Sequence, residues 1–196
     1  MLTIIITILT IVISIYAWNN PELYSKWLLT PYKVKKYNEF SRFITSGFIH
    51  ADYMHLAFNM IAFFFFGMSV EGFFGSYLFV FLYLSGIVVS DIPTYLKHKN
   101  NFYYNSLGAS GGVSSIIFSS ILLSPLRTIR IFFIPMPGFV FGILYLIYSY
   151  YMSKQSRDLV NHDAHFYGAV YGIGFTIIYD PTVVPDFFQQ LKHFSF

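Results

Sequence analysis

Six apolar stretches constrain this chain more than any other feature of its sequence. A helix that crosses the hydrocarbon core of a bilayer needs about 20 mostly apolar residues, and each stretch comes close to that length. They cover residues 2–18, 53–70, 73–93, 107–123, 131–152 and 164–179. The first lacks the basic segment and the small-residue cleavage site of a signal peptide, which indicates a retained span. We therefore predict one all-α membrane domain over residues 1–196, built as a bundle of six transmembrane helices.

The composition favours a chain solvated by lipid over one with a large soluble core. Charged residues make up 11% of the chain and hydrophobic residues 56%, whereas about a quarter of the residues in a soluble domain are charged. The net charge of +3 is too small to indicate nucleic acid as a partner. Because the chain has no cysteine, it can form no thiol nucleophile, no Cys-ligated metal site and no disulfide. The partner that the composition predicts is the lipid bilayer.

The connection between the first two stretches, residues 19–51, mixes basic residues with aromatic ones. This mixture is typical of a segment that lies on the membrane surface. A solvated loop is the alternative, but it would expose apolar side chains such as Leu29, Phe40 and Phe43 to water. We therefore expect a long interfacial loop between the first and second spans.

Polar residues at three of the apolar stretches mark candidate functional sites, because polar groups inside lipid are costly. The second stretch follows His50 and carries His55 and Asn59, which share one face of a helix at i and i+4. Ser110 lies near the start of the fourth stretch and His165 near the start of the sixth. Each also has a structural interpretation, since polar groups in spans commonly hydrogen-bond neighbouring helices.

The order of the crossings brings these residues to one side of the membrane. The second, fourth and sixth stretches are alternate crossings, so all three begin at the same face of the bilayer. Small residues recur at helical spacing in the last two, and such stripes allow helix backbones to approach closely. They are Gly108, Gly111, Gly112, Ser115 and Ser119 in the fourth stretch and Gly168 and Gly172 in the sixth. A serine hydroxyl and an imidazole then come within hydrogen-bond reach, as base-activated nucleophilic attack requires.

The chemistry that this arrangement predicts is acyl transfer by a Ser–His dyad. Ser110 serves as nucleophile and His165 as general base. The side chains of His50 and Asn59 and the Ser110 backbone N–H donate to the developing oxyanion. No carboxylate fits the third position of a triad, since Asp163 projects from a different face of its helix. The prediction includes no metal and no cofactor.

Four motifs, in order along nearly the whole chain, make it resemble the rhomboid family of intramembrane serine proteases. The pattern of His, four residues, His, and Asn after three more fits residues 50–59, G-x-x-x-E-x-x-x-G fits 67–75, G-x-S-G fits 108–111, and A-H-x-x-G-x-x-x-G fits 164–172. The resemblance implies a six-helix bundle with a water-filled cavity, Ser110 as nucleophile and His165 as general base. It also implies that His50, Asn59 and the Ser110 N–H hold the oxyanion, and that the substrates are transmembrane helices of membrane proteins.

Other residues of these motifs are expected to have structural roles. His55 is assigned to packing below the site. Glu71 is assigned to backbone N–H groups at the turn into the third span, where an anion near a helix start is favourable. The family usually has a Trp-Arg pair in the first loop, and this chain has Ser41-Arg42, so Arg42 keeps its structural role there. The glycines expected to pack near the site are Gly108, Gly111, Gly168 and Gly172.

Two expectations concern residues around the dyad. Some family members carry a tyrosine four residues after the nucleophile, where it stacks on the catalytic histidine. That position is Ser114 here, so we expect Tyr167 or Tyr171 to position His165 instead.

The second expectation concerns the entry of substrate. A peptide bond inside a transmembrane helix is protected by the helix's own hydrogen bonds, so a substrate must unwind locally and enter from the side. The fifth span is expected to be the gate, because it has few small residues for close packing and four bulky ones: Phe139, Phe141, Tyr145 and Tyr148.

Two alternatives from other classes remain. A metal enzyme is one, because four histidines could gather at one face: His50, His55, His162 and His165. The chain has no H-E-x-x-H motif and few histidines for a di-iron site. The other alternative is a catalytically weak rhomboid-like protein that binds client transmembrane helices. Relatives of that kind lose the serine or the histidine, whereas this chain keeps both.

Two arguments about orientation disagree. Most of the 12 Lys and Arg residues lie in loops on the side of the predicted site, and the positive-inside rule would then place the site in the cytoplasm. Bacterial rhomboids, which the chain resembles, have the opposite arrangement. Following the family, we expect a multi-pass protein of the bacterial inner membrane with its active site facing outward.

Overall fold

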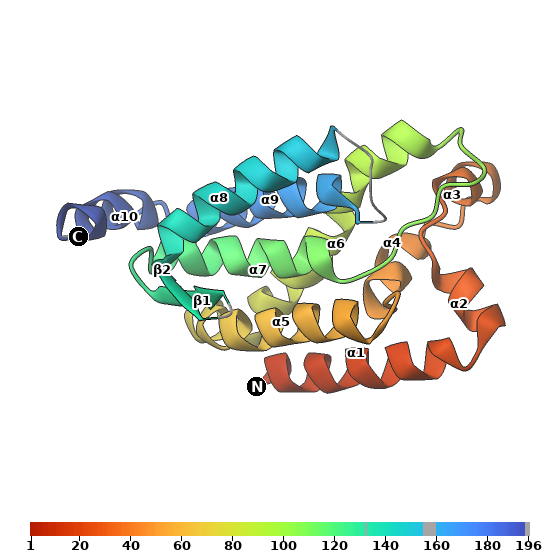
Figure 1. Ribbon diagram of the computed structural model, residues 1–196, viewed down its shortest axis with the longest axis horizontal. Coiled ribbons are helices and arrows are strands. Elements are labelled where there is room, and N and C mark those ends of the chain that lie inside the picture. Colours follow the sequence, from red (N-terminus) through yellow and green to blue (C-terminus); the bar gives the residue numbers. More distant parts are fainter. Residues whose placement is uncertain (132, 155–159, 195–196) are drawn as a thin grey trace.

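The computed structural model describes residues 1–131, 133–154 and 160–194. Within these residues the chain forms ten α-helices, one 3-10 helix and two short strands. The helices that correspond to the apolar stretches are α1 (Leu2–Trp18), α5 (Tyr53–Phe74), α6 (Ser76–His98), α7 (Ser110–Leu123), α8 (Gly138–Ser153) and α9 (His162–Tyr179). They run along the long axis of the molecule, with α7 between α5 and α8 (Figure 1).

Two of the described helices, α5 and α6, are long and apolar enough to cross a bilayer by length and composition. The helices α1, α7 and α8 are apolar but shorter. The predicted break between the second and third spans at residues 70–73 is wrong, because α5 continues to Phe74. The chain turns at Gly75, whose φ is +74°, a conformation that glycine adopts without steric cost.

A β-hairpin replaces the predicted start of the fifth span. Strand β1 (Thr128–Ile131) pairs antiparallel with β2 (Ile134–Pro137), and α8 begins only at Gly138. Pro135 and Pro137 explain the difference, because proline has no N–H and disfavours helical backbone in the residue before it. The chain is thus mostly helical with one short hairpin, the predicted helix start at residue 131 is wrong, and residue 132 of that predicted span lies outside the described residues.

A further helix, α10 (Val183–Lys192), follows α9 and was not predicted. It projects from the end of the bundle opposite the first loop (Figure 1). Asp180 ends α9, and the side chain of Asp180 accepts a hydrogen bond from the Thr182 N–H over 3.0 Å. This turn lets the chain change direction between the two helices.

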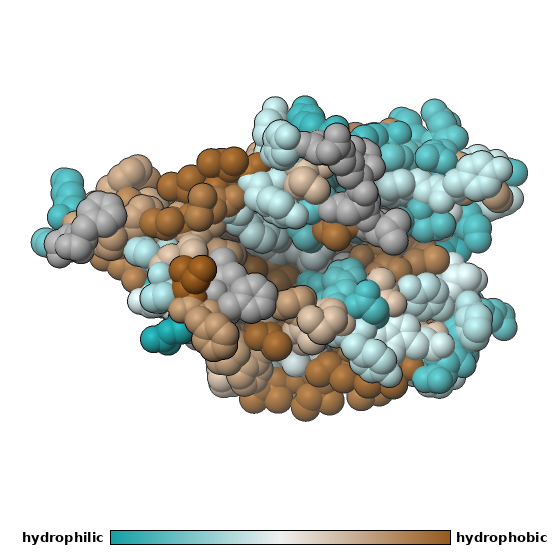
Figure 2. Space-filling view, viewed as in Figure 1, coloured by the Kyte–Doolittle hydropathy of each residue, from teal (hydrophilic) through white to brown (hydrophobic). Residues whose placement is uncertain are grey.

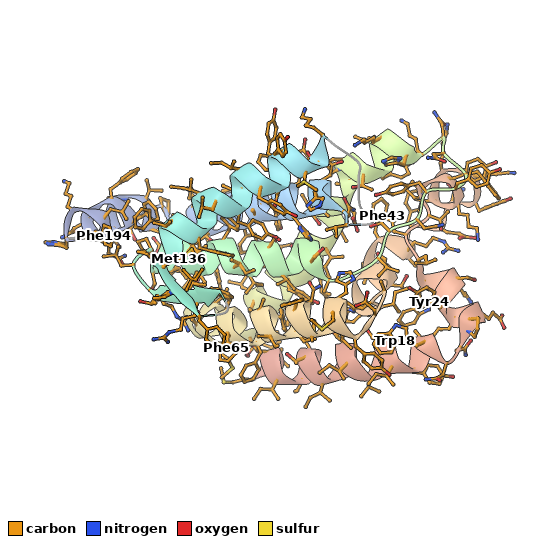
Figure 3. The ribbon with its side chains drawn as sticks, viewed as in Figure 1. Trp18, Tyr24, Phe43, Phe65, Met136 and Phe194 are labelled. Atoms are coloured by element: carbon orange, nitrogen blue, oxygen red, sulfur yellow. The ribbon has the colours of Figure 1, made fainter. Side chains whose placement is uncertain are left out.

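The first loop folds into four short elements: α2 (Pro21–Trp27), α3 (Pro31–Tyr37), α4 (Arg42–Thr45) and η1 (Ser46–Phe48). Leu29 and Phe43 are buried and pack against α6, whereas Phe40 remains 60% exposed. Hydrophilic residues gather at this end of the molecule, and hydrophobic residues cover the outer side of α1 (Figure 2). Trp18 and Tyr24 lie where α1 meets α2 (Figure 3). The loop thus packs partly on the bundle and keeps aromatic side chains at its surface.

Arg42 holds this loop together. Its guanidinium is buried and donates to the carbonyl oxygens of Leu28, over 2.7 Å, and of Ser25, over 3.1 Å. It also forms an ion pair with Glu39. A planar guanidinium with five N–H donors suits such a multiple contact. These buried contacts agree with the structural role expected for Arg42.

The backbones of α7 and α9 touch at two glycines. A Cβ atom built on Gly168 would lie 2.2 Å from the Gly111 carbonyl oxygen, and one built on Gly172 would lie 2.2 Å from the Ser115 carbonyl oxygen. The Ser115 hydroxyl donates to the Gly168 carbonyl over 3.0 Å. The predicted close contact between the fourth and sixth spans is confirmed, and it fixes the starts of α7 and α9 relative to each other.

Glu71 ties the start of α1 to α5 and α6. Its carboxylate accepts hydrogen bonds from the N–H groups of Leu2 (2.7 Å) and Thr3 (2.9 Å) and from the hydroxyls of Thr3 (2.7 Å) and Ser76 (2.6 Å). A helix start leaves its first N–H groups without partners in the helix, and an anion there is favourable. The structural role is as predicted, but the N–H groups belong to α1 and not to the turn into α6.

We expect Glu71→Gln to lower the free energy of unfolding by about 2 kcal/mol, because the amide turns an NH₂ group toward donors that now bond a charged acceptor. The measurement is thermal melting of the purified protein in detergent. Glu22→Gln is the matched control, since Glu22 is an exposed residue in the first turn of α2 and should lose at most about 1 kcal/mol. Equal losses in both variants would contradict the role of Glu71.

Candidate active site

A cavity of about 540 Å³ lies among α5, α7, α8 and α9. Ser110 and His165 both line it, together with His55 and Asn59 of α5. Ser110 is the first residue of α7, and His165 lies in the first turn of α9. The structure thus brings these four residues together at one cavity. The apolar part of the wall includes Met54, Phe58, Ala62, Leu107, Val113, Ile117 and Phe141.

The segment that leads into Ser110 is held by the first loop. Ser106 and Leu29 exchange two backbone hydrogen bonds of 2.9 Å, and the Gly108 N–H donates to the Ser46 carbonyl over 2.9 Å. Because the first N–H groups of a helix have no partner within it, the Ser110 N–H is a donor at the positive end of the α7 dipole. The loop therefore positions both the hydroxyl and the backbone donor of Ser110.

His50 lies behind the cavity wall and not on it. Its side chain is fully buried, and the Ala109 N–H donates to its Nε2 over 3.4 Å. Its Nδ1 lies 3.0 Å from the Ser14 hydroxyl, which donates to the Phe48 carbonyl over 2.9 Å. This network assigns the ring proton to Nδ1. Burial lowers the pKa of His50 to about 3, so the ring is neutral and bonds to the residue before Ser110.

His55 lines the cavity beside Ser110. Its ring faces the cavity and packs edge to face against His50, with ring centroids 5.0 Å apart. Gly108, whose φ is +112°, leaves room for it, since a Cβ atom there would lie 2.7 Å from His55 Cε1. Asn59 donates to the His55 carbonyl over 2.9 Å, and the second N–H of an amide nitrogen remains to donate into the cavity. The structure thus places His55, and not His50, on the cavity wall.

Tyr145 of α8 stacks on His165. Their ring centroids are 6.0 Å apart, and the rings are inclined by 29°. The Tyr145 hydroxyl lies 2.7 Å from the Ser114 hydroxyl, which fixes the ring from the other end. The expectation that Tyr167 or Tyr171 positions His165 is wrong: Tyr167 is 42% exposed, and the Tyr171 hydroxyl bonds to Ser85 over 2.7 Å.

Acidic residues around the site are engaged with other partners. Asp163 forms an ion pair with Lys97 at 3.3 Å, and Asp91 accepts a hydrogen bond from Asn161 over 3.2 Å. Asp52 lines the cavity and caps α5. In the part of the chain that the structure describes, no three His, Asp or Glu side chains gather where they could hold a metal ion. Of the acidic residues named here, Asp52 lines the cavity, and its side chain accepts from the His55 N–H.

The sequence analysis missed Asn161 and assigned Tyr145 to the gate without its contact to His165. Asn161 had a local signal, because an Asn before an apolar run is a helix N-cap pattern, and its Oδ1 does accept from the Ala164 N–H over 3.1 Å. Tyr145 had none, since its contact with His165 joins two helices whose rotation no spacing reveals.

The comparison with protein families places these residues in a known domain. The Rhomboid domain matches residues 37–181, a range that includes every residue on the cavity wall. All four motifs described from the sequence fall inside residues 37–181. The relationship therefore covers the site as well as the helices that carry it.

Individual relatives agree with this match. RHOMBOID-like protein 12, mitochondrial, of Arabidopsis thaliana is 32% identical over 143 residues, which cover 64% of this chain and 42% of that protein. The human presenilin-associated rhomboid-like protein, mitochondrial, is 30% identical over 141 residues, or 68% of this chain and 36% of that protein. The rhomboid protein YdcA of Bacillus subtilis is 31% identical over 75 residues, or 38% of this chain and 37% of that protein.

The chain spans less than half of the length of these relatives. Two of the three carry mitochondrial names, so the comparisons support a membrane protein but not the predicted bacterial inner membrane. The domain match nevertheless extends over most of the chain and contains the whole cavity. On this ground the chain belongs to the rhomboid family.

Proposed function

We propose that the chain is an intramembrane serine endopeptidase that cleaves transmembrane segments of membrane proteins through Ser110 and His165. The observation that carries the proposal is the single cavity that both residues line with His55 and Asn59. These are the side-chain types that acyl transfer needs as nucleophile, base and oxyanion donors. A protein that only binds client helices needs none of them in one cavity.

In the proposed reaction, the Ser110 hydroxyl oxygen attacks the scissile carbonyl carbon while His165 accepts the hydroxyl proton. The carbonyl oxygen becomes an oxyanion, for which Asn59, His55 and the Ser110 N–H supply donors. His165 then gives its proton to the leaving amine nitrogen, and the first fragment departs. A water molecule, deprotonated by His165, attacks the remaining ester and releases the second fragment.

We further propose that α1, α5, α6, α7, α8 and α9 all cross the bilayer. The outer face of α1 supports this, since it exposes an apolar patch of a size that soluble monomers rarely show. The patch consists of Ile4, Ile5, Ile8, Leu9, Val12 and Ile15. The 14 residues of α7 span about 21 Å, less than the roughly 30 Å of a hydrocarbon core. Ser110, at the start of α7, therefore lies below the membrane surface.

The substrate is proposed to enter between α5 and α8. Phe58 of α5 and Phe141 of α8 line the cavity from its two sides. The four aromatic residues expected to form the gate have different surroundings in the structure. Phe139 packs against Phe194, with ring centroids 5.4 Å apart, and Tyr145 stacks on His165. Of these four aromatic residues, Phe141 and Tyr145 line the cavity. Because Tyr145 contacts His165, we assign Phe141 to the gate.

We expect Phe141→Ala to raise the cleavage rate of a transmembrane substrate and to leave the hydrolysis of a small soluble ester unchanged. The truncation loosens the closure between α8 and α5 without removing the ring that touches His165. Phe139→Ala on the same helix is the matched control and should change neither rate. Tyr145→Ala should slow both reactions, because His165 loses its stacking partner. Equal acceleration of both substrates by Phe141→Ala would show that the chemistry had changed and would contradict the gate.

The experiment that tests the proposed function is the cleavage of a transmembrane segment by the purified protein in detergent. Mass spectrometry of the fragments locates the cleaved bond, and a fluorophosphonate probe reports the reactive serine. We expect cleavage that a metal chelator does not inhibit. If the protein holds the segment without cutting it, the chain is a client-binding member of the family instead.

A further inference from the structure

One amide group, that of Asn161, joins three separate parts of the chain. Its Oδ1 accepts hydrogen bonds from the Ala164 N–H (3.1 Å), at the start of α9, and from the Thr94 hydroxyl of α6 (3.0 Å). Its Nδ2 donates to Asp91 Oδ1 of α6 (3.2 Å) and to the Ser106 hydroxyl (3.1 Å). Because an amide has two donors and two acceptor lone pairs, these four bonds use its whole capacity.

The position of Asn161 in the chain gives these bonds their significance. Ser106 lies four residues before Ser110, and Asn161 lies four residues before His165. The Asn161 carbonyl also accepts the His165 N–H over 3.3 Å. One side chain therefore connects the segment that carries the proposed nucleophile to the helix that carries the proposed base. Asn161 itself lines the cavity.

Asp91 sets the orientation of this amide. Its side chain is buried on α6, with 7% of its surface exposed, and a buried acidic group is costly unless it has a hydrogen-bond partner. The Ala164 N–H can only donate and therefore faces Oδ1, while Asp91 Oδ1 accepts from Nδ2, so the two partners hold the amide with Nδ2 toward α6 and Ser106 and with Oδ1 toward Ala164. The rotated amide would place its oxygen against Asp91 and leave α9 without its cap.

We propose that Asn161, oriented by Asp91, is a positioning residue that sets the separation of Ser110 and His165. The proposal rests on the Ser–His chemistry proposed above. The glycine contact between α7 and α9 fixes these helices along their length, and the Asn161 amide fixes the two segments that enter them. A displacement of about 1 Å between reacting groups can cost about a hundredfold in rate.

The test measures how fast a fluorophosphonate probe labels Ser110, per folded molecule, together with kcat and KM for a transmembrane substrate. Asn161→Leu is expected to lower the labelling rate and kcat by about a hundredfold and to leave KM nearly unchanged. Asn20→Leu is the matched control, because Asn20 caps α2 in the same way through the Leu23 N–H, over 3.0 Å. It should lower the melting temperature and leave the labelling rate unchanged.

A reciprocal exchange tests the pairing with Asp91. In Asp91→Asn/Asn161→Asp, the carboxylate at 161 accepts from Ala164, Thr94 and Ser106, and the amide at 91 donates to it. All four bonds are reproduced, so this variant should recover most of the labelling rate lost in Asn161→Leu. Asp91→Asn alone should be mildly affected, since an amide oxygen at 91 can still accept from Asn161.

Ser106→Ala removes only the bond to the nucleophile segment and keeps the cap of α9, so it is informative even if Asn161→Leu does not fold. We expect its labelling rate to fall less than that of Asn161→Leu. Parent-like labelling in Asn161→Leu or in Ser106→Ala would overturn the positioning role, as would a folded exchange variant as slow as Asn161→Leu. A parent protein that the probe does not label at Ser110 would instead reject the proposed function.

Discussion

Ser110→Ala and His165→Ala are each expected to reduce cleavage of a transmembrane substrate by at least about 10⁴-fold. Without the hydroxyl no acyl-enzyme can form, and without the imidazole the hydroxyl proton has no acceptor in the cavity. Both side chains are half-buried on the cavity wall and not in the packed core. The variants should therefore fold and insert like the parent.

The measurement combines initial cleavage rates with melting temperatures and probe labelling. A fluorophosphonate should label the parent and not Ser110→Ala. Ser120→Ala is the matched control, since Ser120 is a buried serine on the same helix whose hydroxyl lies 3.3 Å from that of Ser69. It should be labelled like the parent. Near-normal turnover by Ser110→Ala would show that the chain is not a serine protease.

His55→Ala and Asn59→Ala are each expected to slow turnover about a hundredfold, because the loss of one oxyanion donor costs about 3 kcal/mol in the barrier. Both residues line the cavity beside Ser110; His55 lies in the first turn of α5, which Asp52 caps, and Asn59 lies one turn further along. The effect should lie in kcat and less in KM, since the charge on the oxygen develops only in the transition state. The measurement is a full rate-against-concentration curve for each variant.

His50→Ala distinguishes the two assignments of the histidines. The structure predicts mainly a loss of stability, because the buried Ala109 N–H loses its acceptor, at about 1–3 kcal/mol for an unsatisfied group, and the Ser14 hydroxyl keeps only its bond to the Phe48 carbonyl. Melting temperature and turnover of the folded fraction are measured for His50→Ala and His55→Ala together. If His50→Ala slowed turnover at an unchanged melting temperature while His55→Ala did not, the assignment made from the sequence would be right.

The places where the sequence analysis failed share a feature. His50 and His55 both precede Asn59 in one motif, and which ring faces the cavity depends on where α5 begins. Asp52 caps that helix, so His55 lies in its first turn, whereas His50 stays in the extended segment and bonds to Ser14 of α1. A spacing measured within one segment does not report a partner 36 residues away.

Spacing within one segment also failed to reveal the distant partners of Glu71, Tyr145 and Asn161. Glu71 satisfies the start of α1, with partners 68 and 69 residues before it. Tyr145 reaches His165 from α8, and Asn161 reaches Asp91 and Ser106. Each contact depends on the rotation and depth of two helices, and these are settled by the packing of all helices at once.

The sequence by itself determined the apolar helices, including the bounds of α1, and the gathering of Ser110 and His165 at the starts of alternate helices. It also determined the glycine contact between α7 and α9. These features depend on local periodicity, on the length of each apolar run and on the order in which the runs follow one another. All three can be read directly from the order of the residues. Only the tertiary structure decided which side chains complete the site, because hydrogen bonds and ring contacts between distant segments require the helices to be placed relative to one another before any partner can be identified.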